Sequence, residues 1–275
     1  MILRHFAFLC LIFVPYLSEA QIFNGSVIDP ATKEPLAYVN IGVIGKGIGT
    51  VSDMSGKFSI PLNDSVSNEY LRFSYIGYQS QTYKVKEFLK KFTDGTVIGM
   101  QQNVTTLSQI VIKPKVYKTK YLGNTNKSKS LMAGFKTNKL GCELGTIMRI
   151  KKSPTFIESV NFNIAKNLIT DAKFRVNIYS MKNGQPDSTL LKEPIYVTTS
   201  MVYGTLTVDL KKYDLWVNGD FFVSLEWIED YGTGKLYFCA GLMDSNSMGR
   251  NTSQDKWQKA TPIGIGFNAK VNYEK

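Results

Sequence analysis

The stretch GKGIGTVSDMSGKFSI, residues 45–60, begins like a phosphate-binding loop and ends like a β-hairpin. A dinucleotide fingerprint needs G-x-G-x-x-G between a strand and a helix, and a P-loop needs Lys followed by Ser or Thr; the three early glycines match neither pattern. Asp53 and Gly56 occupy the favoured first and last positions of a type I turn. Strand-like sequence flanks this turn, with no helix to bind phosphate. The stretch therefore predicts a hairpin that binds no nucleotide and whose glycines serve a β-sandwich.

Residues 21–112 around this hairpin carry turn residues about every ten positions, with alternating apolar segments between them. Phe58, Ile60 and Leu62, for example, fall on one face of a strand. One short helix is predicted at 85–92. The predicted strands span residues 22–28, 39–43, 49–52, 57–62, 70–75, 82–85, 95–100 and 108–112. This pattern predicts an all-β sandwich or partial barrel.

The segment 141–275 is also rich in alternating apolar stretches such as SVNFNI, FRVNIYS and FFVSLEW, separated by turn clusters at 184–188 and 217–220. Its predicted strands span residues 145–150, 156–164, 172–179, 195–199, 204–209, 221–227, 235–242 and 266–273. The sequence therefore predicts a second β-sandwich.

The first twenty residues have the pattern of a secretory signal peptide. Arg4 precedes an apolar run at 6–14, and Ser18 and Ala20 are small residues at the positions that a signal peptidase inspects. The apolar run is too short to span a bilayer, which needs about 20 residues. We expect residues 1–20 to be removed on export, so that the mature chain begins at Gln21.

The segment 113–140 is strongly basic, with eight lysines and no acidic residue between 113 and 139. It contains glycine, asparagine and serine as well, and this composition favours a solvated linker between the two sandwiches. A sharper alternative is contact with anionic lipid head groups or a polyanionic glycan. Nucleic acid is not an expected partner, because no aromatic residues alternate with these lysines to stack on bases.

His5, the single histidine of the chain, lies within the predicted signal peptide. Its position excludes a Ser-His-Asp or Cys-His centre and a His-ligated zinc from the mature protein. We predict no enzyme activity, no metal and no cofactor. Cys142 and Cys239 remain after export, and they either form a disulfide or act as two buried small hydrophobes.

The sequences GSVIDPATKEPLAYVNIGVIGKGIGTVSDMSGKFSIPL and LRFSYIGYQSQ resemble the carboxypeptidase-regulatory-like domain. The motifs are G-x-V-x-D at 25–29, G-T-x-S-D-x-x-G-x-F at 49–58 and S-Y-I-G-Y at 74–78. The resemblance covers about residues 22–112 and implies a CnaB-type, transthyretin-like β-sandwich, a module also found at the N-terminus of SusC-type TonB-dependent receptors. It implies no peptidase activity. Residues 141–275 are similar to the jelly-roll-like sandwiches that follow this module in secreted bacterial proteins.

Two groups of side chains in the second half are candidates for function. Glu226, Glu229 and Asp230 form the densest acidic group, which fits a glycosidase pair or, better, a solvated or calcium-decorated turn. The second group contains large aromatic residues, which either pack in the core or form a carbohydrate platform if two or more are exposed and coplanar. The candidate ligand-facing aromatics are Trp216, Trp227 and Trp257.

These features together predict a secreted, non-catalytic interaction or structural protein in the envelope of a Gram-negative bacterium. We expect it in the periplasm or on the outer-membrane surface, with an envelope protein or a glycan as its partner. The alternatives are a carbohydrate-binding module of a glycan-uptake system and, third, a hydrolase that works without histidine. The predicted organisation is a signal peptide at 1–20, the first sandwich at 21–112, a linker at 113–140 and the second sandwich at 141–275.

Overall fold

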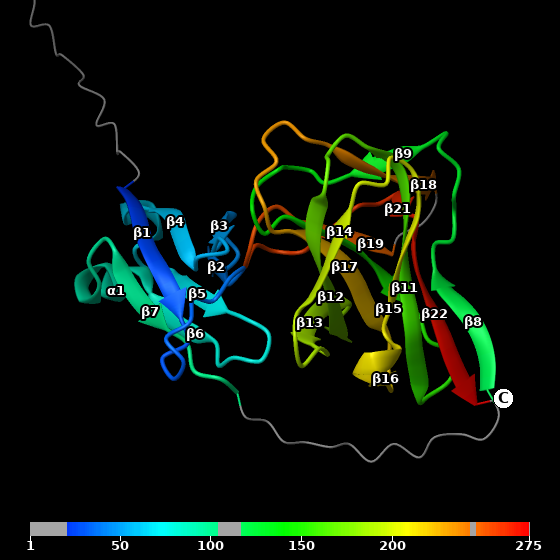
Figure 1. The fold of residues 1–275 in the computed structure, drawn as a ribbon, viewed down its shortest axis with the longest axis horizontal. Coiled ribbons are helices and arrows are strands. Elements are labelled where there is room, and N and C mark those ends of the chain that lie inside the picture. Colours follow the sequence, from blue (N-terminus) through cyan, green and yellow to red (C-terminus); the bar gives the residue numbers. More distant parts are fainter. Residues whose placement is uncertain (1–20, 104–116, 243–245, 275) are drawn as a thin grey trace, which may run out of the picture.

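The computed structural model describes residues 21–103, 117–242 and 246–274, which form two β-sandwich domains (Figure 1). We call residues 21–103 the first domain and the other described residues the second domain. The predicted signal peptide at 1–20 and the predicted strand at 108–112 lie outside the described residues. Within the described ranges, no helix is both long enough and apolar enough to cross a membrane.

The first domain consists of a three-stranded sheet with the order β4-β1-β7 and a four-stranded sheet with the order β3-β2-β5-β6. The alternation predicted for β4 is confirmed, because Phe58, Ile60 and Leu62 are buried between the two sheets. The elements are β1 (Gln21–Ile28), β2 (Asn40–Val43), β3 (Ile48–Val51), β4 (Lys57–Leu62), η1 (Asp64–Val66), β5 (Tyr70–Ser74), β6 (Gln81–Lys84), α1 (Val85–Lys91) and β7 (Thr96–Gly99).

The turn between β3 and β4 forms as the sequence predicts. The Asp53 carboxylate accepts hydrogen bonds from the backbone N–H groups of Ser55 at 2.8 Å and Lys57 at 2.9 Å, and the Gly56 N–H donates to the Asp53 carbonyl at 3.0 Å. Gly56 has a φ of 76°, which favours glycine. A Cβ at Gly56 would lie 2.5 Å from the carbonyl oxygen of Val27. This glycine therefore allows the turn to close against β1.

The second domain is a larger sandwich of two sheets, with most elements at their predicted positions. Its elements are β8 (Tyr117–Gly123), β9 (Met132–Gly134), β10 (Glu143–Met148), β11 (Thr155–Asn167), β12 (Ala172–Lys182), β13 (Gln185–Thr189), β14 (Ile195–Thr199), β15 (Gly204–Asp209), η2 (Lys211–Tyr213), β16 (Trp216–Val217), β17 (Phe221–Trp227), β18 (Leu236–Leu242), β19 (Ser247–Arg250), β20 (Gln258–Lys259), β21 (Ile263–Ile265) and β22 (Phe267–Glu274). In the described part of this domain, β-strands thus far outnumber every other kind of secondary structure.

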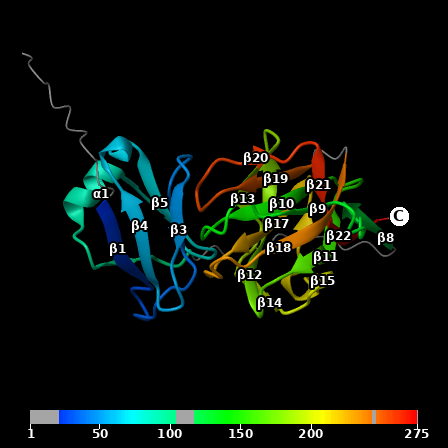
Figure 2. The same cartoon turned by 90° about the horizontal axis from the view of Figure 1, so that it is seen from above.

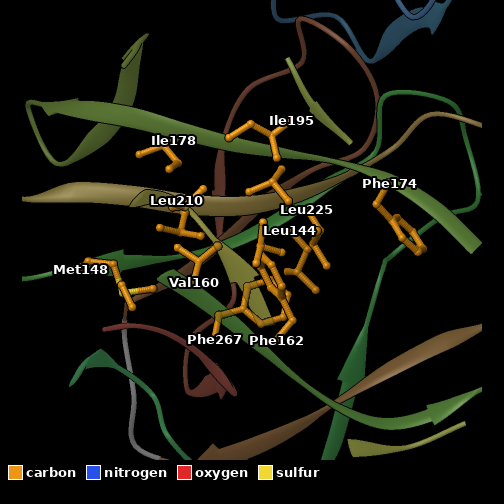
Figure 3. Packing of buried hydrophobic residues seen from close by; sticks show 14 of the residues in the cluster. Leu144, Met148, Val160, Phe162, Phe174, Ile178, Ile195, Leu210, Leu225 and Phe267 are labelled. Atoms are coloured by element: carbon orange, nitrogen blue, oxygen red, sulfur yellow. The ribbon is translucent and has the colours of Figure 1, made fainter. Parts of the chain in front are cut away.

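One sheet of the second domain has the order β13-β12-β17-β10-β19-β20, with β14 also paired to β12, and we call it the inner sheet because it faces the first domain (Figure 1). The other has the order β21-β18-β11-β22-β8, with β9, β15 and β16 at its margins. The core lies between these sheets, where Leu144, Phe174 and Leu225 of the inner sheet pack with Phe162 and Phe267 of the other (Figure 3).

The predicted linker at 113–140 is wrong where the structure has strands, and residues 113–116 of it lie outside the described residues. Residues 117–123 form β8, which pairs antiparallel with β22, and Met132–Gly134 form β9, which pairs with β18. Leu122 is buried in the core of the second domain, whereas the lysines of β8 are exposed. The sequence pattern did not indicate this strand because an edge strand buries few of its side chains, so its lysine-rich composition favoured a solvated linker instead.

Gly56→Ala is expected to lower the free energy of unfolding by at least about 2 kcal/mol, because the new methyl group meets the Val27 carbonyl in a backbone conformation that already costs about 1–2 kcal/mol. Gly95→Ala is the matched control: Gly95 also has positive φ, at 83°, but its Cβ would meet nothing within 4 Å. Urea unfolding of the two variants measures the difference. Equal losses would show that the contact with Val27 has no energetic weight.

Candidate binding cleft between the two domains

The first domain docks on the second through the hairpin of β2 and β3, which lies on the side facing the second domain (Figure 2). Gly42 and Gly49 are directly opposite in this hairpin. A Cβ at Gly42 would lie 2.3 Å from the carbonyl oxygen of Ser253, and one at Gly49 would lie 2.4 Å from the same oxygen. Gly42 and Gly49 therefore serve the contact between the domains, and for Gly49 this corrects the expectation that the glycines of the 45–60 stretch serve the sandwich.

Hydrogen bonds fix this contact. The Gly45 N–H donates to the Gln254 carbonyl at 2.8 Å, and the Gln254 side-chain amide donates to the Ser74 hydroxyl, also at 2.8 Å. The Ser253 hydroxyl donates to Oδ1 of Asn40 at 3.0 Å. The loop after β19 thus holds the first domain by both backbone and side-chain groups.

Arg175 on β12 makes the deepest link between the domains. Its side chain is 1% exposed, and its Nε and Nη2 donate to Oε2 of Glu226 at 2.9 and 2.8 Å. The same guanidinium reaches the first domain, where Nη1 donates to the carbonyl of Tyr38 at 2.6 Å and Nη2 to Oδ1 of Asn40 at 2.7 Å. One buried cation therefore joins the inner sheet to the start of β2.

Arg175 is the first member of a row of charges across four strands. Arg175 lies opposite Glu226, Glu226 opposite Glu143, and Glu143 opposite Arg250, so the row crosses β12, β17, β10 and β19. Arg250 donates from Nη2 to Oε2 of Glu143 at 2.6 Å. Asn177 lies between the carboxylates and donates to Glu143 at 2.8 Å and to Glu226 at 2.7 Å. We call this set of five residues the charge row.

The protonation preferences in the charge row follow from burial and pairing. Burial raises the pKa of Glu143, against the opposing effect of the positive charge on Arg250. Burial alone would lower the pKa of Arg175, but the Glu226 carboxylate outweighs it and raises that pKa. The Glu143 carboxylate raises the pKa of Arg250 in the same way. Both arginines are therefore cations, and they neutralise the two carboxylates.

A second polar contact lies beside the charge row. Tyr38 is 3% exposed and has a φ of 62°, an uncommon conformation for a bulky residue. Its hydroxyl donates to Glu229 at 2.5 Å and accepts from the Lys173 ammonium at 3.1 Å. Burial and the bond to Glu229 raise the pKa of Tyr38 above its ordinary value. Burial and Glu229 likewise raise the pKa of Tyr231 to about 12.

The docked domains enclose a cleft of about 670 Å³ above the charge row. Its volume is in the range of about 300–1,000 Å³ that is typical of small-molecule sites. Residues of the first domain that line it include Asn40, Arg72, Ser74, Tyr75, Tyr78, Ser80 and Asn103. Residues of the second domain that line it include Arg175, Asn177, Tyr179, Asp187, Ser188, Thr189, Lys192 and Arg250. The walls are mostly polar and come from both domains.

The three tryptophans do not form a carbohydrate platform. Trp227 is 0% exposed and packs in the core against Phe174, which contradicts its expected ligand-facing position. Trp257 packs on the Arg250 guanidinium at 4.9 Å. Trp216 lies on the opposite sheet from the cleft, where its ring is tilted by 42° against Phe156. The three rings therefore pack against different neighbours in different parts of the fold.

The acidic group predicted at Glu226, Glu229 and Asp230 is split by the fold. Glu226 is fully buried in the charge row, which contradicts the expected solvated turn for that residue, and Glu229 binds Tyr38 and Tyr231. Asp230 accepts from the Gly232 N–H within its own loop, as a turn residue does. Cys142 and Cys239 are both buried and unbridged, so the structure has the two small hydrophobes and no disulfide.

Sequence reasoning missed Arg72, Arg175, Glu143 and Arg250, although a signal was present for two of them, Arg175 and Glu143. Both of these residues, like Glu226, belong to strands in which most buried positions are apolar. Charged residues are rarely buried without a partner, so such positions predict an ion pair. The pairing itself depends on strand register over long sequence distances, which this pattern does not supply.

The architecture places the chain among two-domain all-β proteins, and comparison with known proteins identifies its first domain. Residues 23–112 match the model of the CarboxypepD_reg-like domain family. The first domain is therefore a CarboxypepD_reg-like domain, as the resemblance in the sequence indicated. A second β-sandwich follows it in the chain. That family is non-catalytic. No curated protein matches the chain.

Several solved structures are similar to the chain. A structure of the cysteine protease and lectin-like domains of Cwp84, a surface layer associated protein of Clostridium difficile, has 10% identity and a TM-score of 0.43, over 83% of this chain and 46% of that one. Clostridial Cwp84 after propeptide cleavage has 13% identity and a TM-score of 0.42, over 83% and 52%. The chain thus spans about half the length of these structures.

Gly42→Ala is expected to loosen the docking of the domains, because the methyl group would collide with the Ser253 carbonyl. Small-angle X-ray scattering should show a larger radius of gyration, with an unchanged far-ultraviolet circular dichroism spectrum. Gly99→Ala is the control, since a Cβ there would meet only ordinary contacts of 3.4 Å or more. A compact Gly42→Ala protein would contradict this role of the hairpin.

Tyr38→Phe is expected to reduce the loss of stability in alkaline solution. The pKa of the Tyr38 hydroxyl is raised above 10.0 in the folded protein, so the unfolded chain loses the hydroxyl proton at lower pH than the folded protein does. The contribution of this hydroxyl to stability is therefore present below pH 10 and declines above it. The wild type should therefore lose up to about 1.4 kcal/mol more per pH unit than the variant above about pH 10. Urea unfolding at about pH 9 and about pH 11 measures this; parallel slopes would contradict it.

Proposed function

We propose that the chain is an exported, non-catalytic binding protein of the cell envelope that holds its ligand in the cleft between its domains. The observation that carries this proposal is a polar cleft of about 670 Å³ whose walls come from both domains. Its floor is fixed by the charge row, in which Arg175 and Arg250 are held by buried carboxylates. A site of this kind loses little conformational freedom when a ligand binds.

Several observations support a role without catalysis. The first domain belongs to a non-catalytic family, and the single histidine of the chain is His5. Glu143 and Glu226 lie close enough to bind the same Asn177 amide, so they resemble the pair of carboxylates that a glycosidase needs. They are 1% and 0% exposed, however, and each is neutralised by an arginine. Carboxylates in this state do not contact a substrate.

Export and an envelope location form part of the proposal. The apolar run and small residues within 1–20 support removal of a signal peptide before Gln21. Intact-mass measurement of the protein secreted by its host tests this point, and a mass that includes residues 1–20 would contradict it. The partner in this compartment is an envelope glycan or an envelope protein.

Blocking the cleft tests the binding role. Ser188 is exposed and lines the cleft, so Ser188→Trp should fill its opening and weaken binding at least tenfold. Gln185→Trp is the matched control, because Gln185 is an exposed residue of the same strand β13 and does not line the cleft. Ligands are found by thermal-shift screening of neutral saccharides, acidic saccharides and acidic peptides, and affinities are then measured by calorimetry.

The two tryptophan variants separate the cleft from the rest of the surface. Loss of binding in Ser188→Trp with full binding in Gln185→Trp supports the proposal. Equal affinities in both variants would place the ligand elsewhere and overturn the cleft as the binding site. Release of cleavage products from a bound saccharide or peptide would overturn the non-catalytic role.

A further inference from the structure

The charges that line the cleft do not balance. Arg72, Arg175, Arg250 and Lys192 are cationic, and Asp187 is the acidic residue among the lining residues. Arg175 and Arg250 are neutralised by Glu226 and Glu143 of the charge row. The remaining lining charges are two cations against one carboxylate, so the cleft favours an anion.

Arg72 on β5 is a lining cation for which the described residues supply no counter-ion. Its Nη2 donates to the neutral Ser80 hydroxyl at 3.1 Å, and its Nε is shielded from solvent and has no acceptor. Among the residues that the structure describes, no carboxylate forms an ion pair with this half-buried guanidinium. Partial burial of a cation is costly unless an anion accompanies it. A guanidinium binds a carboxylate through two parallel hydrogen bonds, which fits the missing partner.

Two tyrosine rings line the same cleft in fixed positions. The rings of Tyr75 and Tyr78 have their centroids 5.3 Å apart. The Tyr75 hydroxyl shares a hydrogen bond of 3.2 Å with the Tyr196 hydroxyl, and the Tyr78 hydroxyl donates to Asp29 at 3.0 Å. Because both hydroxyls are held by the protein, the rings are fixed before any ligand arrives. Fixed aromatic rings suit the apolar C–H face of a sugar ring.

The other lining groups suit hydroxyl groups. Ser80, Asn103, Ser188 and Thr189 are exposed polar side chains around the opening. They donate and accept hydrogen bonds with equal ease, as neighbouring sugar hydroxyls require. A bound peptide would instead use a row of backbone N–H and C=O groups along a strand edge.

We propose that the ligand of the cleft is a saccharide that carries carboxylates, a uronic-acid oligosaccharide, and that Arg72 binds one of these carboxylates. The inference rests on the proposed binding function of the cleft and adds the chemical class of its ligand. Arg72 supplies the carboxylate site, Tyr75 and Tyr78 the sugar-ring site, and the polar side chains at the opening the hydroxyl sites.

Calorimetry of the full chain with short oligomers of galacturonate, glucuronate and mannuronate tests the proposal. Arg72→Gln is expected to weaken binding of the recognised uronate at least tenfold. Arg72→Lys keeps the charge and loses the two parallel bonds, so its affinity should lie between those of the wild type and Arg72→Gln. Arg149→Gln is the matched control, because Arg149 is an exposed arginine outside the cleft that pairs with Asp220. The methyl ester of the recognised oligomer should bind the wild type about as weakly as the uronate binds Arg72→Gln.

The outcomes separate this inference from the function on which it rests. No binding of any of the three uronates to the wild type overturns the inference, as do equal affinities for Arg72→Gln and Arg149→Gln. If Ser188→Trp abolishes binding of a neutral saccharide or an acidic peptide while Arg72→Gln does not, the cleft is the site and the uronate class is wrong. Melting temperatures of Arg72→Gln and Arg149→Gln within a degree or so of each other show that lost affinity reflects lost contacts rather than unfolding.

Discussion

Four charges in one row, three of them fully buried, dominate the architecture of this protein. Arg175, Glu226, Glu143 and Arg250 lie side by side on the inner sheet, on the face opposite to its apolar core. Taking such charges out of water is costly unless every one is paired. The first domain completes the pairing, since Tyr38 and Asn40 accept hydrogen bonds from Arg175. The docking of the domains and the polarity of the cleft therefore have a common origin.

The close approach of the domains follows from backbone rather than from large side chains. A carbonyl of the loop after β19 lies where two side chains of the hairpin would otherwise stand, at Gly42 and Gly49. Tyr38, with its left-handed backbone, then turns its carbonyl toward Arg175 and its hydroxyl toward Glu229. Strain of this kind costs about 1–3 kcal/mol, and it persists because several contacts hold the residue in place.

Local sequence patterns predicted most of the strands, because each sandwich buries one face of its strands and leaves alternation as the signal. The same patterns missed β8, whose lysines face solvent at the edge of a sheet, and the short strands β9, β16, β19, β20 and β21. They also predicted a turn at 184–188, where the structure has the strand β13. They also missed the cleft, since Arg72 and Arg250 belong to different domains and line one cleft only when the two folded domains dock. The prediction that Trp227 faces a ligand failed for a similar reason. An aromatic residue in a strand can lie on either face of the sheet, and the strand register decides which face is buried.

The two glycines opposite the Ser253 carbonyl limit how freely this module can be exchanged between proteins. A related domain grafted in place of residues 21–103 would keep its own core. It would dock, however, only if it had glycine at both hairpin positions and a hydrogen-bond acceptor at the position of Asn40. Without them, Arg175 would lose two of its acceptors while its charge stayed buried. The two halves of the chain are therefore constrained to evolve as one unit, even though each has a hydrophobic core of its own.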